Sequence, residues 1–305
     1  MLDLRPRFSE VLMVVRSHET EIPTPDRQRL FVRSYETWSP AGRTLLVSHG
    51  ASEHGERYRH IAEFFAEQGW NVIVGDHRGH GRSSGVRTHV RHFGQYPEDL
   101  ELIRRHFGLA PESTAVLGHS MGGLIGIRHA QMFPDQVAAL VLVSPLLKVK
   151  VPIPRRTLAL GRMLSLVAPR VRFETRVDPL TTTRCPDALE RRLKDALMHR
   201  SVTARWFFAM RAGMQSAWKS AGRLKTPLLV LQAGADEIVD PIAPEQWLKR
   251  AGSSDQTFHT FPEHLHELLN EPDWPATANL ISQWLDQRIA RQAMPLSNRE
   301  PEPVA

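Results

Sequence analysis

The segment from residue 115 to residue 132 constrains the fold more than any other part of this sequence. A short apolar run is followed by Gly-His-Ser-Met-Gly-Gly at 118–123 and then by a helical pattern. This is a G-x-S-x-G motif in a strand–turn–helix context, in which the serine sits on a tight turn and exposes its hydroxyl above a sheet. Glycine is needed on both flanks because a Cβ would clash in so tight a turn. Ser120 is therefore the predicted nucleophile, rather than part of a merely structural glycine turn.

Short apolar runs alternate with amphipathic stretches through most of the chain. Residues 29–36 alternate polar and apolar side chains, whereas the other strand candidates are continuous apolar runs, as in strands covered on both faces. These runs lie at 44–47, 71–74, 115–117, 137–143 and 227–231, and helical patterns lie at 58–68, 98–107, 122–132 and 244–251. Strand–helix alternation predicts an α/β fold with a mostly parallel sheet and right-handed crossovers.

The alternation stops at residues 148–222, which have a helical pattern and no convincing strand. This segment carries 16 Lys and Arg against 5 Asp and Glu, a net charge of +11 in a chain whose net charge is +6. We predict a discontinuous core of residues 1–147 and 223–305, with 148–222 forming a basic helical cap over the sheet edge where ligands bind. One apolar stripe in the cap has helical spacing and comprises Leu160, Met163, Leu164 and Val167. Lining an acyl tunnel, contact with a membrane and packing of the cap onto the core are alternative roles for it.

The basic charge of the cap has three interpretations. An anionic membrane surface or lipid headgroup fits local basic charge, and a merely solvated helical surface fits it equally well. Nucleic acid is disfavoured because no helix-turn-helix, zinc-finger or RNP pattern accompanies the charge. The charge alone therefore leaves peripheral membrane contact as a hypothesis.

A serine nucleophile requires a base and an acid that orients the base. In folds that carry this serine turn, the acid follows the serine in the sequence and the histidine follows the acid. Asp236 comes a few residues after the apolar run at 227–231, where a carboxylate reaches the top edge of the sheet. Asp240 directly precedes Pro241 and is more typical of a helix start. Asp236 is the predicted acid, with Asp240 as the alternative.

Three histidines follow Asp236 in the chain. His259 falls within a short strand pattern at 257–261, whereas His264 and His266 lie in the loop after it, and His266 opens a helical segment at 267–270. We predict His266 as the base, with His264 as the alternative. In this mechanism His266 takes the proton of Ser120 and returns it to the leaving group.

The mechanism also needs two N–H groups for the oxyanion. One is expected from Met121, the residue after the nucleophile, and the other from the loop that follows the run at 44–47. That loop reads Ser-His-Gly-Ala-Ser-Glu-His-Gly at 48–55, and Ala51 is our candidate. The alternative is that His-Gly is simply a turn.

A second glycine-rich loop, Asp-His-Arg-Gly-His-Gly-Arg-Ser at 76–83, follows another strand. We predict that Asp76 and Arg78 brace it near the site. A metal site at His77 and His80 is disfavoured, because an arginine separates them and no further ligand pattern accompanies them. The single cysteine, Cys185, excludes an intramolecular disulfide and a cysteine zinc cage and is predicted to be inert.

The sequence offers little evidence for membrane insertion or export. The longest uncharged run, at 113–127, has 15 residues, fewer than the ~18 needed to span a bilayer. The N-terminus carries acids early and only a five-residue apolar stretch at 11–15, a poor signal peptide. We predict a soluble, cytoplasmic protein whose basic cap is available for peripheral membrane contact.

Together these motifs resemble the α/β-hydrolase superfamily, specifically its monoacylglycerol lipase and lysophospholipase branch, also grouped with serine aminopeptidase-like hydrolases. The resemblance covers about residues 21–288. It rests on five segments: 118–123, His49-Gly-Ala-Ser-Glu-His54 with Arg57-Tyr58, Asp76-His-Arg-Gly-His-Gly81, Ala235-Asp236, and His266-Glu-Leu-Leu-Asn-Glu-Pro272. Two departures are Ser52, where the branch commonly has glycine, and Glu263-His264, where small residues are more usual.

The resemblance implies a mostly parallel eight-stranded sheet flanked by helices, with a helical cap between strands six and seven. It also implies cofactor-free hydrolysis of single-chain lipid esters through an acyl-enzyme, with Ser120, Asp236 and His266 as triad and Ala51 and Met121 as oxyanion donors. A short-chain carboxylesterase, a proline-releasing peptidase and an acyltransferase remain alternatives on the same triad. Epoxide hydrolysis and dehalogenation are disfavoured, because such relatives use an aspartate at the position of Ser120. A non-catalytic binding protein would usually have a broken triad.

Overall fold

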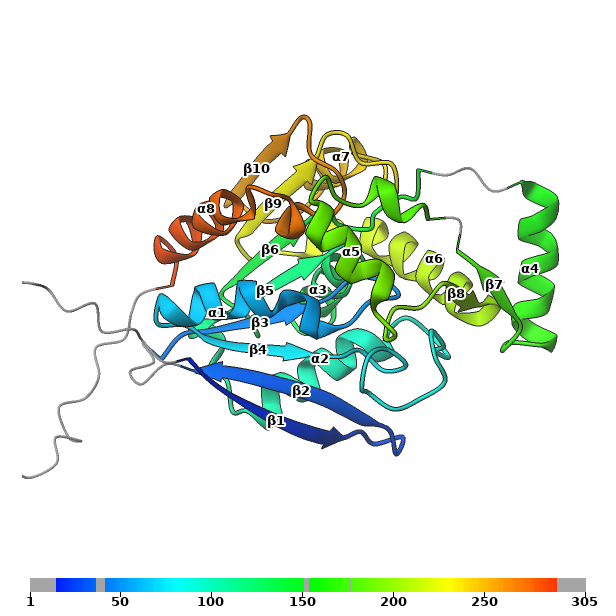
Figure 1. The fold of residues 1–305 in the computed structure, drawn as a ribbon, viewed down its shortest axis with the longest axis horizontal. Coiled ribbons are helices and arrows are strands. Elements are labelled where there is room, and N and C mark those ends of the chain that lie inside the picture. Colours follow the sequence, from blue (N-terminus) through cyan, green and yellow to red (C-terminus); the bar gives the residue numbers. More distant parts are fainter. Residues whose placement is uncertain (1–14, 37–41, 151–153, 176, 290–305) are drawn as a thin grey trace, which may run out of the picture.

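A large twisted sheet runs through the centre of the molecule (Figure 1). The computed structural model describes residues 15–36, 42–150, 154–175 and 177–289. The eight strands lie in the order β1-β2-β4-β3-β5-β6-β9-β10. Their bounds are β1 Arg16–Pro23, β2 Arg29–Glu36, β3 Thr44–Ser48, β4 Asn71–Gly75, β5 Thr114–His119, β6 Ala139–Val143, β9 Leu228–Ala233 and β10 Gln256–Phe261. The last six pair in parallel, and β1 and β2 pair antiparallel, which confirms the predicted mostly parallel α/β sheet.

Helices cover both faces of the sheet, and the continuous apolar runs of the central strands follow from this. Strands β3, β5, β6 and β9 are buried along their whole length. One face packs against η1 Gly55–Tyr58, α1 Arg59–Glu67 and α8 Trp274–Asp286. The other packs against α2 Gln95–His106, α3 Met121–Met132, α6 Ala204–Lys219 and α7 Ala243–Leu248. The carboxyl ends of β3, β5 and β9 therefore open on one edge, where loops can meet.

Between β6 and β9 the chain leaves the sheet. It forms α4 Arg155–Val167, β7 Arg172–Glu174, η3 Pro179–Thr181, α5 Pro186–Lys194, β8 Ser201–Thr203 and then α6. The expectation that this segment has no strand is wrong, because β7 and β8 pair antiparallel. Three residues per strand are too few to show a period-two pattern in the sequence. The last helix, α6, also packs into the core, where Trp206 Nε1 donates to the Tyr96 hydroxyl at 2.8 Å.

Two elements of the core were not predicted. β1 is an edge strand whose side chains are mostly exposed, so it shows no apolar pattern. α8 follows the predicted helical segment at 267–270, which is only a short 3₁₀ turn, η5 Leu268–Asn270. The N-terminal stretch at 11–15 lies outside the described residues except for its last residue. In the described part of the chain, no helix combines the length and apolar character needed to cross a bilayer.

Candidate active site

Ser120 lies between the end of β5 and the start of α3. Its backbone has φ 53° and ψ −116°, a positive-φ conformation that costs a non-glycine residue of order 1–3 kcal/mol and is typical of functional sites. The turn is held by hydrogen bonds from Ser120 N to Val143 O at 2.9 Å and from Leu146 N to Ser120 O at 2.9 Å. A Cβ on Gly122 would overlap the Ser48 carbonyl oxygen. This confirms that the tight turn requires glycine there.

His266 and Asp236 come together at the same edge of the sheet. His266 Nδ1 lies 2.6 Å from Asp236 Oδ2, and both side chains are almost fully buried. The other carboxylate oxygen accepts the N–H groups of Ile238 at 2.8 Å and Val239 at 3.0 Å. Burial alone would raise the pKa of Asp236, but His266 and these two N–H groups outweigh burial and lower it. The ionised carboxylate can only accept, so Nδ1 carries the proton and Nε2 is left free to act as a base.

The alternatives for acid and base lie in different surroundings. Asp240 accepts the Ile242 N–H at 3.0 Å and pairs with Lys148 at 2.6 Å. It lies just before α7 but is not its N-cap residue, which is Ile242. His264 lies 2.9 Å from Asp273, whose side chain is 55% exposed. Of the candidates compared, only the pair of His266 and Asp236 combines burial with contact to the residue before the nucleophile, because the His266 and His119 ring centroids are 4.8 Å apart.

The loop after β3, which carries Ala51, is fixed by buried polar contacts. The N–H of His77 donates to His49 Nε2 at 2.9 Å, so this nitrogen is unprotonated and Nδ1 donates to the Gly50 carbonyl at 2.8 Å. Burial lowers the pKa of His49 to about 3, which keeps this arrangement neutral. Ser52 has φ 64°, the conformation that favours glycine. Met121 is the first residue of α3, where backbone N–H groups lack partners within the helix.

The second glycine-rich loop is braced as predicted. Asp76 accepts the N–H groups of Gly55 and Arg82, each at 2.7 Å, and thereby ties the loop to η1. The Arg78 guanidinium contacts Asp99 at 2.6 Å and Asp26 at 2.8 Å. Within the residues that the structure describes, no three His, Cys, Asp or Glu side chains are grouped to hold a metal ion. Cys185 is a half-buried free thiol directly before α5.

Sequence reasoning gave no role to a buried polar cluster around His119. Glu53 accepts the Gly50 N–H at 2.6 Å and the Tyr58 hydroxyl at 2.7 Å, and it lies 3.4 Å from His119 Nδ1. The other ring nitrogen of His119 lies 3.2 Å from the His266 carbonyl oxygen. Burial opposes charge on His119, but Glu53 outweighs it and raises the pKa of His119. The only local signal for this cluster was the charged segment 53–57, because His119 lies 66 residues from Glu53 in the chain.

The chain is similar to known hydrolases in sequence and in fold. The family model described as "Serine aminopeptidase, S33" matches residues 39–273. The chain belongs to this family. It is an α/β hydrolase of the monoacylglycerol lipase and lysophospholipase branch, and a carboxylic ester hydrolase.

Relatives and solved structures agree with this assignment over most of the chain. The phospholipase YtpA of Bacillus subtilis is 29% identical over 80% of this chain and 95% of its own length. A monoacylglycerol lipase of Mycolicibacterium smegmatis is 28% identical over 82% of this chain and 91% of its own. The crystal structure of the Paleococcus ferrophilus monoacylglycerol lipase superposes with a TM-score of 0.79 at 28% identity, and the match covers 85% of this chain and 99% of that one.

Proposed function

We propose that this hydrolase cleaves the carboxylic ester of single-chain lipids, namely monoacylglycerols or lysophospholipids, through an acyl-enzyme on Ser120. The observation that carries the proposal is the buried contact of 2.6 Å between His266 and Asp236, at the sheet edge that also holds the strained Ser120 turn. The matched relatives, named as a monoacylglycerol lipase and a phospholipase, support the lipid substrate class.

The side chains act in the following order. Ser120 Oγ attacks the ester carbonyl carbon while His266 Nε2 takes its proton, and Asp236 holds the imidazole in the required tautomer and stabilises the imidazolium. The N–H groups of Ala51 and Met121 receive the oxyanion, and one such donor contributes about 2.7–4 kcal/mol to lowering the barrier. The C–O bond then breaks, and His266 returns the proton to the departing alcohol. Water repeats the sequence on the acyl-enzyme and releases the fatty acid.

Substrate preference tests this proposal. Each methylene buried in an acyl site contributes roughly 0.8 kcal/mol, so kcat/KM is expected to rise by about tenfold or more from short-chain to long-chain monoacylglycerols or lysophospholipids. Fatty-acid release is measured across the series. Cleavage of short esters alone would reduce the function to that of a general carboxylesterase. Release of N-terminal proline from peptides, or acyl transfer to an added alcohol in preference to water, would favour the peptidase or acyltransferase alternative.

We also propose that the outer face of the cap contacts anionic lipid. Helix α4 lies at the periphery of the molecule (Figure 1). Three members of the apolar stripe, Leu160, Met163 and Val167, are between 53% and 72% exposed, so packing of the cap onto the core does not account for them. The same helix carries Arg155, Arg156 and Arg162 and no acidic residue. An apolar face flanked by arginines is typical of helices that lie in a membrane interface.

Vesicle binding tests the membrane proposal. The double change Leu166→Ser and Val167→Ser removes two exposed apolar side chains from α4 and should weaken binding to phosphatidylglycerol-containing vesicles by roughly tenfold or more. Hydrolysis of a soluble short-chain ester should not change. The matched control is Ile242→Ser, which removes a side chain that is 60% exposed but lies outside the cap. Equal binding by the wild type and the α4 variant in vesicle sedimentation would contradict the proposal.

A further inference from the structure

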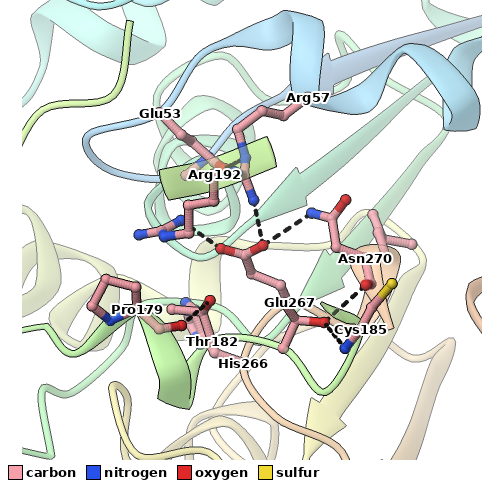
Figure 2. A network of polar contacts seen from close by, with 12 residues as sticks. Glu53, Arg57, Pro179, Thr182, Cys185, Arg192, His266, Glu267 and Asn270 are labelled. Atoms are coloured by element: carbon pink, nitrogen blue, oxygen red, sulfur yellow. Dashed lines mark hydrogen bonds and ion pairs between the residues drawn. The ribbon is translucent and has the colours of Figure 1, made fainter. Parts of the chain in front are cut away.

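The residue directly after the predicted base occupies an unusual position. The Glu267 side chain is only 3% exposed, and its carboxylate is shared by partners from two parts of the molecule. Arg57 from η1 in the core pairs with one oxygen, which also accepts from Asn270 Nδ2 at 3.1 Å. Arg192 from α5 pairs with the other oxygen at 2.6 Å. Figure 2 shows the two guanidinium groups meeting this one carboxylate.

The same ion pairs continue to the loop of the predicted oxyanion site. Arg57 Nε lies 2.8 Å from Glu53 Oε2, so Arg57 is placed between two buried carboxylates. Glu53 in turn accepts the N–H of Gly50, the residue before Ala51, at 2.6 Å. A continuous series of buried charges therefore joins α5, the loop that carries His266 and the loop that carries Ala51.

Charge balance explains why Arg192 matters in this series. Glu53 and Glu267 bring two negative charges into the protein interior. Arg57 lies between them, and Glu53 also faces His119, whose pKa it raises. A buried charge that loses its partner is strongly destabilised. Arg192 supplies the second positive charge at Glu267, and it comes from α5 rather than from the core. Glu267 therefore keeps both of its guanidinium partners only while α5 is docked against the loop of His266.

A second set of contacts ties the same cap segment to the same loop. The N–H of Glu267 donates to the Thr182 carbonyl at 2.8 Å, and the Thr183 hydroxyl donates to the Asn270 carbonyl at 2.8 Å. Arg184 pairs with buried Glu271 at 2.7 Å. The loop that begins at His266 is thus held from the cap side at three residues, Glu267, Asn270 and Glu271.

We propose that Arg192 and Glu267 are positioning residues that couple docking of α5 to the alignment of His266. This rests on the proposed function, in which His266 is the general base. When α5 is docked, the ion pair fixes the backbone on the carboxyl side of His266 and so fixes the imidazole that pairs with Asp236. When α5 moves away, Glu267 loses one counter-charge and the loop relaxes, so turnover depends on the position of the cap even for a substrate that the cap does not bind.

The variant Arg192→Met tests the coupling with a soluble short-chain ester. A displacement of about 1 Å in a catalytic group can reduce the rate by up to about 100-fold, so we expect kcat to fall by roughly tenfold or more with little change in KM. Arg192→Lys keeps the charge and should retain most of kcat. The matched control is Lys194→Met, which breaks an exposed ion pair with Glu190 within α5 and should leave kcat unchanged.

A double-mutant cycle distinguishes coupling from general destabilisation. Glu267→Gln should lower kcat to a similar extent, and adding Arg192→Met to it should lower kcat little further, because both changes remove the same interaction. An unchanged kcat in Arg192→Met, or losses that multiply in the double variant, would overturn the inference. Should Arg192→Met fail to fold, Arg192→Gln alone and combined with Glu267→Gln gives the same comparison.

The outcome can be separated from a failure of the proposed function. Labelling of Ser120 by a fluorophosphonate reports the activated serine independently of turnover. Rapid labelling of the wild type and equally rapid labelling of Arg192→Met would refute the coupling while the serine mechanism stands. Ester hydrolysis that survives in Ser120→Ala would instead refute the mechanism itself.

Discussion

Replacing Ser120 with alanine is expected to lower kcat for lipid-ester hydrolysis by roughly 10⁶-fold, the loss seen when the nucleophile of a serine triad is removed. The hydroxyl is the only group at this turn that can form the acyl-enzyme in the proposed mechanism, and neither His266 nor Asp236 replaces it. Fatty-acid release from a long-chain monoacylglycerol, measured at high enzyme concentration, gives the residual rate. Labelling by a fluorophosphonate should be lost in the same variant.

Ser144 offers a matched control for this change. It follows β6, the strand next to β5, it is buried, as Ser120 is, and it has a positive φ of 43°. Ser144→Ala removes the same hydroxyl from a similarly strained position at the neighbouring strand end. We expect activity within a few-fold of the wild type. Substantial hydrolysis in Ser120→Ala together with a large loss in Ser144→Ala would show that the nucleophile has been misassigned.

The core of the fold was predictable because its elements carry local signals. β3, β5 and β9 are continuous apolar runs, since helices cover both faces of the sheet. β1 was missed for the opposite reason: it is held by backbone pairing with β2, and its side chains, largely exposed, leave no hydrophobic pattern. β7 and β8 exist only because residues 172–174 and 201–203 meet in space. These two segments are far apart in the sequence, so no local sequence pattern indicates that they pair.

In the candidate site, too, the residues that carry a local sequence signal could be predicted, and those held by distant partners could not. Ser120 could be predicted as the nucleophile because its turn has a characteristic local sequence. Asp236 and His266 could be predicted because the fold places the acid and the base in a fixed order after successive strands. The contacts around Glu267 could not be predicted from the sequence, since its partners Arg57 and Arg192 lie 210 and 75 residues away in the chain. A glutamate next to a histidine indicates a polar loop, but only the tertiary structure shows that it is buried between two arginines.

Replacing Asp236 with asparagine is expected to lower kcat by roughly 10⁴-fold with a smaller effect on KM. The amide has nearly the same shape as the carboxylate, but its NH2 group can donate a hydrogen bond to an unprotonated Nδ1, which stabilises the wrong tautomer and leaves no base at Nε2. It also removes the negative charge that stabilises the imidazolium. The low pKa of Asp236 keeps this carboxylate ionised at neutral pH, so the loss should persist across the neutral range. Steady-state kinetics at several pH values measure it.

Asp240→Asn is the control that separates the two acids in this loop. Asp240 bonds the start of α7 and Lys148 and has no contact with His266 among the described interactions, so its replacement should change kcat by no more than about twofold while lowering thermal stability slightly. If Asp240→Asn lost activity and Asp236→Asn kept it, the assignment of the acid would be wrong. If both kept it, His266 would not depend on a carboxylate partner. A large loss confined to Asp236→Asn, with His264→Ala remaining active, is the pattern that only a triad of Ser120, Asp236 and His266 produces.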